Sequence, residues 1–188
     1  DLETLEAEAH ELPGSASDFA WSADGGRYAV ALAPTPLVDD SYTSRDIFVV
    51  DTASAKVQAE MGSVGKLGSF AFSPDGERIA YVGSVDIHDP SAGRLYVTST
   101  AGGERREVVP EYLGHVIDFV WLHDNNIRWL GHRGVYTEWA NASVFETESP
   151  GEAPQSGPIV RAVHGNPGQE AVAAIADSPQ HPFELYLL

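Results

Sequence analysis

The sequence contains no cysteine, only two lysines and no long apolar run. Without cysteine the chain has no disulfide, no thiolate zinc site and no cysteine nucleophile, and neither an oxidising nor a reducing compartment is favoured. No segment approaches the roughly 18 uncharged apolar residues of a membrane span, and the acidic start is unlike a signal peptide. We therefore expect a soluble protein, with the choice between bacterial cytoplasm and periplasm left open.

Basic residues are scarce compared with acidic ones. The 188 residues include 11 basic and 28 acidic side chains, which gives a formal net charge of −17, and no basic run interrupts this excess. Such a field repels phosphates and anionic lipids. We expect neither nucleic acid nor a membrane surface as a partner.

A repeat runs through the chain. Residues 19–30 (FAWSADGGRYAV) align with residues 70–81 (FAFSPDGERIAY), and the two aspartates of the aligned segments are 51 residues apart. Residues 119–130 form a weaker third copy and residues 163–174 a degenerate fourth. Each copy reads as a short apolar strand, a turn and a second strand, followed by one or two further strands. The turns Asp24-Gly25, Asp75-Gly76 and Asp124-Asn125 supply residues that tolerate the positive φ of tight hairpins.

Repeats of this length with about four strands each are typical of β-propeller blades, so we expect an all-β fold of about four four-stranded blades. The expected division is residues 1–12 as the end of a preceding blade or a linker, 13–66 as blade one, 67–114 as blade two, 115–156 as blade three, and 157–188 as an incomplete blade four. In blade three we expect a hairpin that turns at Asn141. We expect a segment of a seven- or eight-bladed ring; the alternative is a four-bladed ring closed by residues 2–12.

One aromatic residue recurs at the same repeat position. Trp21, Phe72 and Trp121 occupy equivalent places in the first three copies. Large side chains at a repeated position are most simply the packing between neighbouring blades. We therefore expect all three to be buried.

The repeats also resemble those of a known family. The segments WSADG at residues 21–25 and FSPDG at 72–76 look like the propeller repeats shared by the prolyl oligopeptidase family and TolB-type proteins. Residues 34–51 (PTPLVDDSYTSRDIFVVD) and 178–186 (SPQHPFELY) resemble propellers of acylaminoacyl-peptidase-like or dipeptidyl-peptidase-like members of that family. The resemblance implies a non-catalytic propeller beside a downstream α/β-hydrolase domain that carries the serine peptidase chemistry.

The long connection after the second strand holds the candidate substrate-binding residues, Asp39, Asp40, Tyr42 and Arg45. Long loops on rigid scaffolds often carry function. Adjacent carboxylates can hold the α-amino group of a peptide, and an arginine can hold a carboxylate or a carbonyl. The alternative is a solvated turn in which Arg45 is an ion-pair partner of the two acids.

The sequence offers little support for catalysis or metal binding by this chain. No Gly-x-Ser-x-Gly elbow occurs, so we expect no catalytic residue in this chain. The seven histidines show no metal-ligand spacing, and we expect no metal and no other cofactor.

The sequence thus favours the non-catalytic propeller part of a serine peptidase that restricts access to peptides and orients them. The alternative is a TolB-like protein-interaction propeller without a catalytic domain. Homo-oligomer formation stays open.

Overall fold

The computed structural model describes all residues except 1–6, 8, 89, 147–156, 169–170 and 188. Its described part forms four antiparallel sheets, in which each strand pairs with its neighbours along the chain. The first sheet holds β1 (Ser15–Trp21), β2 (Arg27–Ala33), β3 (Asp46–Asp51) and β4 (Val57–Met61). The second holds β5 (Leu67–Phe72), β6 (Arg78–Ser84), β7 (Gly93–Ser99) and β8 (Arg106–Glu107). The third holds β9 (His115–His123), β10 (Asn126–Arg133) and β11 (Tyr136–Ser143). The fourth holds β12 (Ile159–Gly165), β13 (Val172–Ser178) and β14 (His181–Leu187).

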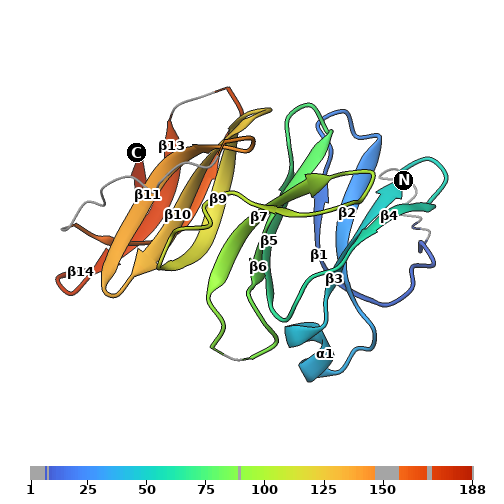
Figure 1. Ribbon diagram of the computed structural model, residues 1–188, viewed down its shortest axis with the longest axis horizontal. Helices are drawn as coiled ribbons and strands as arrows, with labels where there is room; N and C mark the ends of the chain where they lie inside the picture. Colours follow the sequence, from blue (N-terminus) through green and yellow to red (C-terminus); the bar gives the residue numbers. More distant parts are fainter. Residues whose placement is uncertain (1–6, 8, 89, 147–156, 169–170, 188) are drawn as a thin grey trace.

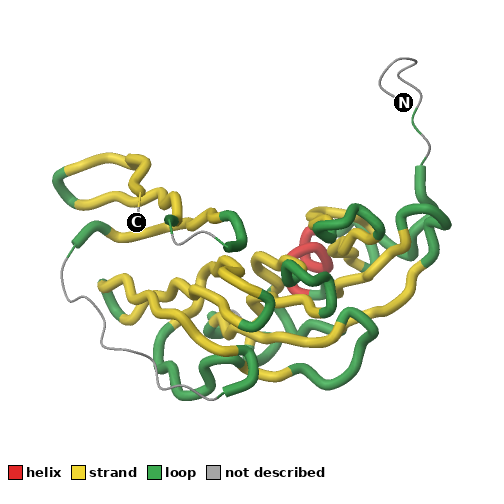
Figure 2. The backbone as a smooth tube through the Cα atoms, turned by 90° about the horizontal axis from the view of Figure 1, so that it is seen from above, coloured by secondary structure: helices red, strands yellow, loops and turns green. Residues whose placement is uncertain are grey.

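The four sheets follow one another in chain order, from sheet one at the right of Figure 1 to sheets three and four, which overlap at the left. Seen from above, the row is curved, and strands make up nearly all of its regular structure (Figure 2). The short helix α1 (Val38–Thr43) interrupts the connection between β2 and β3. The expected all-β propeller architecture is confirmed.

Sheet two shows why the sheets pack side by side. Side chains of a strand alternate between its two faces, and both faces of this sheet are apolar. Ile79 and Tyr81 of β6 pack in the cluster shared with sheet one, whereas Ala80 and Val82 pack in the cluster shared with sheet three. A small sheet with two apolar faces is stable only between two neighbours. The core therefore consists of seams between sheets rather than one central cluster.

The aromatic residue at the shared repeat position fills two of these seams. Phe72 is 7% exposed and packs against sheet one, and Trp121 is 4% exposed and packs against sheet two. The Trp121 indole Nε1–H also donates to the Ala71 carbonyl at 3.2 Å, across the seam. These two expectations are confirmed. The expectation for Trp21 is wrong, because its side chain is 54% exposed and contacts only the tilted Tyr28 ring among described aromatic residues. Sheet one has no preceding sheet among the described residues to cover this position.

The Ser-x-Asp-Gly turns have a common hydrogen-bond pattern. Ser22 Oγ donates to Asp24 Oδ1 at 2.6 Å and accepts from the Arg27 N–H at 3.0 Å, while the Gly26 N–H donates to the same carboxylate at 2.9 Å. The hydrogen bond from Ser22 and that from Gly26 lower the pKa of Asp24. Gly25, at φ +69°, takes the left-handed conformation that the turn requires. The same bonds recur one repeat later, from Ser73 and Glu77 to Asp75.

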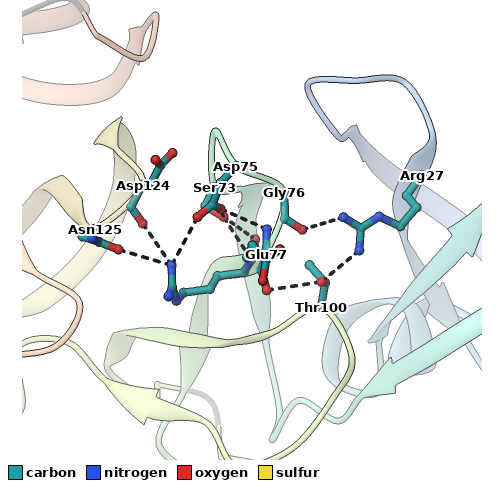
Figure 3. Close-up of polar contacts among 9 residues, drawn as sticks. Arg27, Ser73, Asp75, Gly76, Glu77, Thr100, Asp124 and Asn125 are labelled. Carbon is teal, nitrogen blue, oxygen red and sulfur yellow. Dashed lines mark hydrogen bonds and ion pairs between the residues drawn. The ribbon is translucent and has the colours of Figure 1, made fainter.

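An arginine after each of these turns reaches the next sheet (Figure 3). Arg27 of sheet one donates to the Gly76 carbonyl at 2.7 Å and to Thr100 Oγ1 at 2.9 Å, both in turns between strands of sheet two. Arg78, at the equivalent place in sheet two, donates to the Asp124 carbonyl at 3.4 Å and to Asn125 Oδ1 at 3.3 Å, both in sheet three. The turns of successive sheets are thus linked at one edge of the seams.

Sheet three corrects two expectations. Neither Asp124 nor Asn125 has positive φ; a register shift at Asn126 follows this turn and accommodates it. Asn141 does not lie in a turn either, because β11 is continuous and places Asn141 opposite Arg128. The Arg128 Nε–H donates to Asn141 Oδ1 at 3.0 Å, which explains a polar residue inside the strand. The turn lies instead at Gly134, which has φ +63°.

The packing between sheets predicts different losses of stability when either of two tryptophans at the same repeat position is replaced. Trp121→Ala leaves a cavity between sheets two and three, and we expect it to lower the free energy of unfolding by about 3–5 kcal/mol. Trp21→Ala removes an exposed side chain, so we expect a change within about 0.5 kcal/mol. Urea unfolding followed by far-ultraviolet circular dichroism measures both. Equal losses for the two variants contradict the seam assignment.

Candidate functional site

Asp39 and Asp40 lie in the first turn of α1. The sequence predicts only a long loop here; the acidic residues just after Pro36 were the signal for a helix start. Thr35 organises this start, because its Oγ1 donates to Asp40 Oδ2 at 2.5 Å and accepts from the Leu37 N–H at 3.2 Å. The Asp39 side chain is exposed. Of the two adjacent carboxylates, one is therefore held by the loop and the other faces solvent.

Arg45 connects sheet one to sheet two. Its side chain is 16% exposed, and its Nη1 donates to Asp18 Oδ2 at 2.7 Å and to Ser17 Oγ at 3.1 Å. Its Nη2 donates to the Leu67 carbonyl at the start of β5. The ion-pair partner is thus Asp18 of β1, and not the acids of its own loop as the sequence suggested. Arg45 fixes the end of the loop that carries α1.

Tyr42 places α1 against the connection into sheet two. The Lys66 Nζ lies 4.6 Å from the centre of the half-exposed Tyr42 ring, a cation–π distance. Ser44 and Gly65 form an isolated parallel bridge, and a Cβ at Gly65 would lie within 2.4 Å of the Asp86 carbonyl oxygen. The helix, residues 62–66 and the described residues of 85–92 therefore form one continuous surface, which we call the loop face.

The loop face combines exposed apolar side chains with acidic ones. Leu37 and Val38 are exposed beside α1, and Val85 and Ile87 are exposed on the loop between β6 and β7. Asp39, Asp40 and Asp86 lie among them. Exposed apolar groups next to charges of one sign are typical of binding surfaces. Among the described residues of this face the carboxylates outnumber Lys66, which suits a partner with an apolar body and a cationic group.

A hollow of about 240 Å³ lies between sheets two and three at the same face. Its polar lining comes from Lys66, Ser84, Ser91 and His115, and the rest of the wall is apolar or glycine. His115 Nδ1 accepts the Gly93 N–H at 2.8 Å, a bond from sheet three to sheet two. Burial lowers the pKa of His115, and coulombic interaction with His132, Arg94 and Lys66 adds to this effect.

No group of three or more His, Asp or Glu side chains within the described part of the chain is placed to hold a metal ion. His115 and His132 are opposite each other on β9 and β10, but each is used between sheets. His132 Nε2 donates to the Val160 carbonyl of sheet four at 2.8 Å. Among the described helices, none has the length and apolar character needed to cross a membrane.

Comparisons with known proteins agree with the fold. No family model matches the chain. Dipeptidyl-peptidase 5 of Porphyromonas gingivalis is 30% identical over 128 residues, which cover 64% of this chain and 19% of that protein. The chain therefore spans a small part of the curated relative that it matches, and the match indicates similarity to a piece of a larger peptidase.

Solved structures show the same architecture. TolB from Acinetobacter baumannii matches with a TM-score of 0.66 and 11% identity, over 93% of this chain and 41% of TolB. An oligogalacturonate lyase in complex with manganese matches with a TM-score of 0.74 and 17% identity, over all of this chain and 55% of the lyase. At these identities the likeness shows the propeller fold alone. The chain is thus a propeller-type protein with a sequence relative among the peptidases.

The environment of His115 predicts how stability depends on pH. Because its pKa in the folded chain lies below the ordinary 6.5, the unfolded chain binds a proton more readily than the folded chain. We therefore expect the free energy of unfolding to fall as the pH decreases below about 6.5. In His115→Gln, an amide oxygen accepts in place of Nδ1 without titrating, and this part of the pH dependence should disappear.

Urea unfolding midpoints at pH 7.5 and 5.5 measure this effect. His88→Gln is the matched control, since no hydrogen bond joins the His88 ring to another described residue and its replacement tests the loss of a histidine alone. The assignment is wrong if His88→Gln and His115→Gln alter the difference between the two midpoints equally.

Proposed function

We propose that this chain is a propeller segment of a serine peptidase of the prolyl oligopeptidase type, where it restricts access to peptides and orients them. The observation that carries the proposal is the match to dipeptidyl-peptidase 5 in a chain with the propeller fold. In this function the segment supplies no catalytic residue. A downstream α/β-hydrolase domain of the same protein supplies the nucleophile, and the substrate is a peptide.

In this proposal the loop face contacts the peptide. The carboxylates of Asp39 and Asp40 bind its α-amino group by charge and hydrogen bonding. The half-exposed Tyr42 ring contacts its apolar side chains. Arg45 positions these groups, because its bonds to Asp18 and Leu67 hold the loop against both sheets. A rigid loop limits the ordering entropy that peptide binding costs.

A second candidate is a TolB-like module that docks another protein and has no hydrolase. The TolB structural matches and the exposed Leu37, Val38, Val85 and Ile87 favour it. In that function the same face would bury these side chains against a protein surface with basic residues around an apolar centre. The two functions differ in whether the full gene product carries an active serine.

The test is an assay of the full gene product that includes this chain, on acyl-peptide and dipeptidyl chromogenic substrates, with a fluorophosphonate probe for an active serine. The peptidase proposal predicts labelling and hydrolysis. In the double variant Asp39→Asn, Asp40→Asn, we expect KM to rise about fivefold for substrates with a free amino terminus, since an exposed charge pair contributes about 1 kcal/mol. Acylated substrates and kcat should be unaffected.

Glu77→Gln with Glu104→Gln is the matched control, because it removes the same charge from exposed positions next to the ends of β6 and β7 that lie opposite the loop face. An intact product that neither reacts with the probe nor hydrolyses either substrate class contradicts the peptidase proposal and leaves the docking module. Equal effects of the two double variants contradict the role of Asp39 and Asp40.

A further inference from the structure

Glycine residues form part of the wall of the hollow between sheets two and three. Gly68, Gly83 and Gly93 line it. A Cβ at Gly93 would lie 2.3 Å from the Val116 carbonyl oxygen, and one at Gly68 would lie 3.1 Å from Val82 Cβ. Gly93 thus lets β7 of sheet two approach β9 of sheet three closely, and Gly68 does the same for β5 and β6 within sheet two, around a small space. Its volume of about 240 Å³ is below that of a typical drug-sized pocket and suits a small head group.

His115 presents a hydrogen-bond donor at this hollow. Its Nδ1 accepts the Gly93 N–H, so the neutral ring must carry its proton on Nε2. The structure gives this Nε2 no partner within its described residues, and His115 lines the hollow. A neutral histidine held in one tautomer by a main-chain bond is a directed donor.

Ser91 presents a second donor. Its Oγ accepts from the Val85 N–H at 3.1 Å and from the Asp86 N–H at 3.2 Å. Both bonds use the oxygen as acceptor, so the hydroxyl hydrogen remains for a ligand. These two bonds also fix the serine on the loop, which orders the donor before a ligand arrives.

Basic side chains lie near His115 although the chain as a whole is acidic. Lys66 lines the hollow, and Arg94 on β7 acts on His115 with the same sign. Glu107 Oε1 lies 3.6 Å from Arg94 Nε and compensates its charge, so Lys66 is the cation that acts directly on the hollow. The positive groups that disfavour a proton on His115 also favour an anion beside it.

We infer that this hollow is a binding site for a carboxylate, such as the carboxylate of a small organic acid or of a peptide C-terminus. The His115 Nε2–H and the Ser91 hydroxyl donate to its two oxygens, and the Lys66 charge stabilises it. The apolar wall formed by Val82, Val116 and Ile117 contacts the carbon next to the carboxylate. The inference holds for either function proposed above, because it depends only on the seam between two sheets of this chain.

The test follows the histidine ring protons of the 188-residue chain by NMR while acetate or N-acetyl-alanine is added, with methylammonium chloride at equal ionic strength as control. A bound carboxylate stabilises the protonated ring, so the pH midpoint of His115 should rise and the signals of exposed His88 should stay constant. A stronger effect of N-acetyl-alanine identifies a peptide C-terminus, and an equal effect identifies a small acid.

Single-residue variants test which side chains form the carboxylate site. Ser91→Ala should weaken carboxylate binding about tenfold, because it removes one hydrogen bond to a charged group. Lys66→Met should weaken it while leaving the titration of His115 measurable. Ser99→Ala is the matched control, at an exposed position on the far end of β7. The inference is overturned if neither carboxylate shifts the pH midpoint of His115, or if methylammonium shifts it equally. It is also overturned if the shift caused by the carboxylates is the same in Ser91→Ala and in Lys66→Met as in the unchanged chain.

Discussion

The structure depends on one constraint: a sheet of three or four short strands has two apolar faces and cannot bury both by itself. Sheet two meets this constraint fully, since Ile79 faces one neighbour and Ala80 the other, and both are fully buried. The two seams on either side of sheet two then repeat the same elements. A large aromatic residue of the inner strand fills the space between sheets, and an arginine that follows the turn binds the turn of the next sheet. The repeat in the sequence is therefore a repeat of packing contacts.

The packing between sheets also determines where binding sites can form. Because they hold the strands in place, the connections at one edge are free to vary, and the connection that carries α1 differs from those of the other sheets. Arg45 links this connection to β1 and β5, so the loop face has a fixed shape. The hollow near His115 arises in the seam itself, where three glycines replace side chains. Both candidate sites thus depend on contacts between sheets rather than on any single blade.

Much of the fold could be predicted from the sequence, because the Ser-x-Asp-Gly turn is local and its residues determine its conformation. Features that depend on neighbours could not. Trp21 has the same sequence context as Trp121, and only the absence of a preceding sheet in the described chain leaves it exposed. Asn141 looks like a turn residue until its partner Arg128 is known. Arg45 pairs with Asp18, 27 residues away, which no local pattern indicates.

The most direct test of this account is native-state hydrogen exchange of the backbone amides, which reports local stability along the chain. If the seams provide the stability, the slowest exchange should lie in β6 and β9, which pack against neighbours on both sides. The outer strands β4 and β14, at the ends of the row, should exchange much faster. Protection that is uniform over the four sheets, or greatest in β14, contradicts the account.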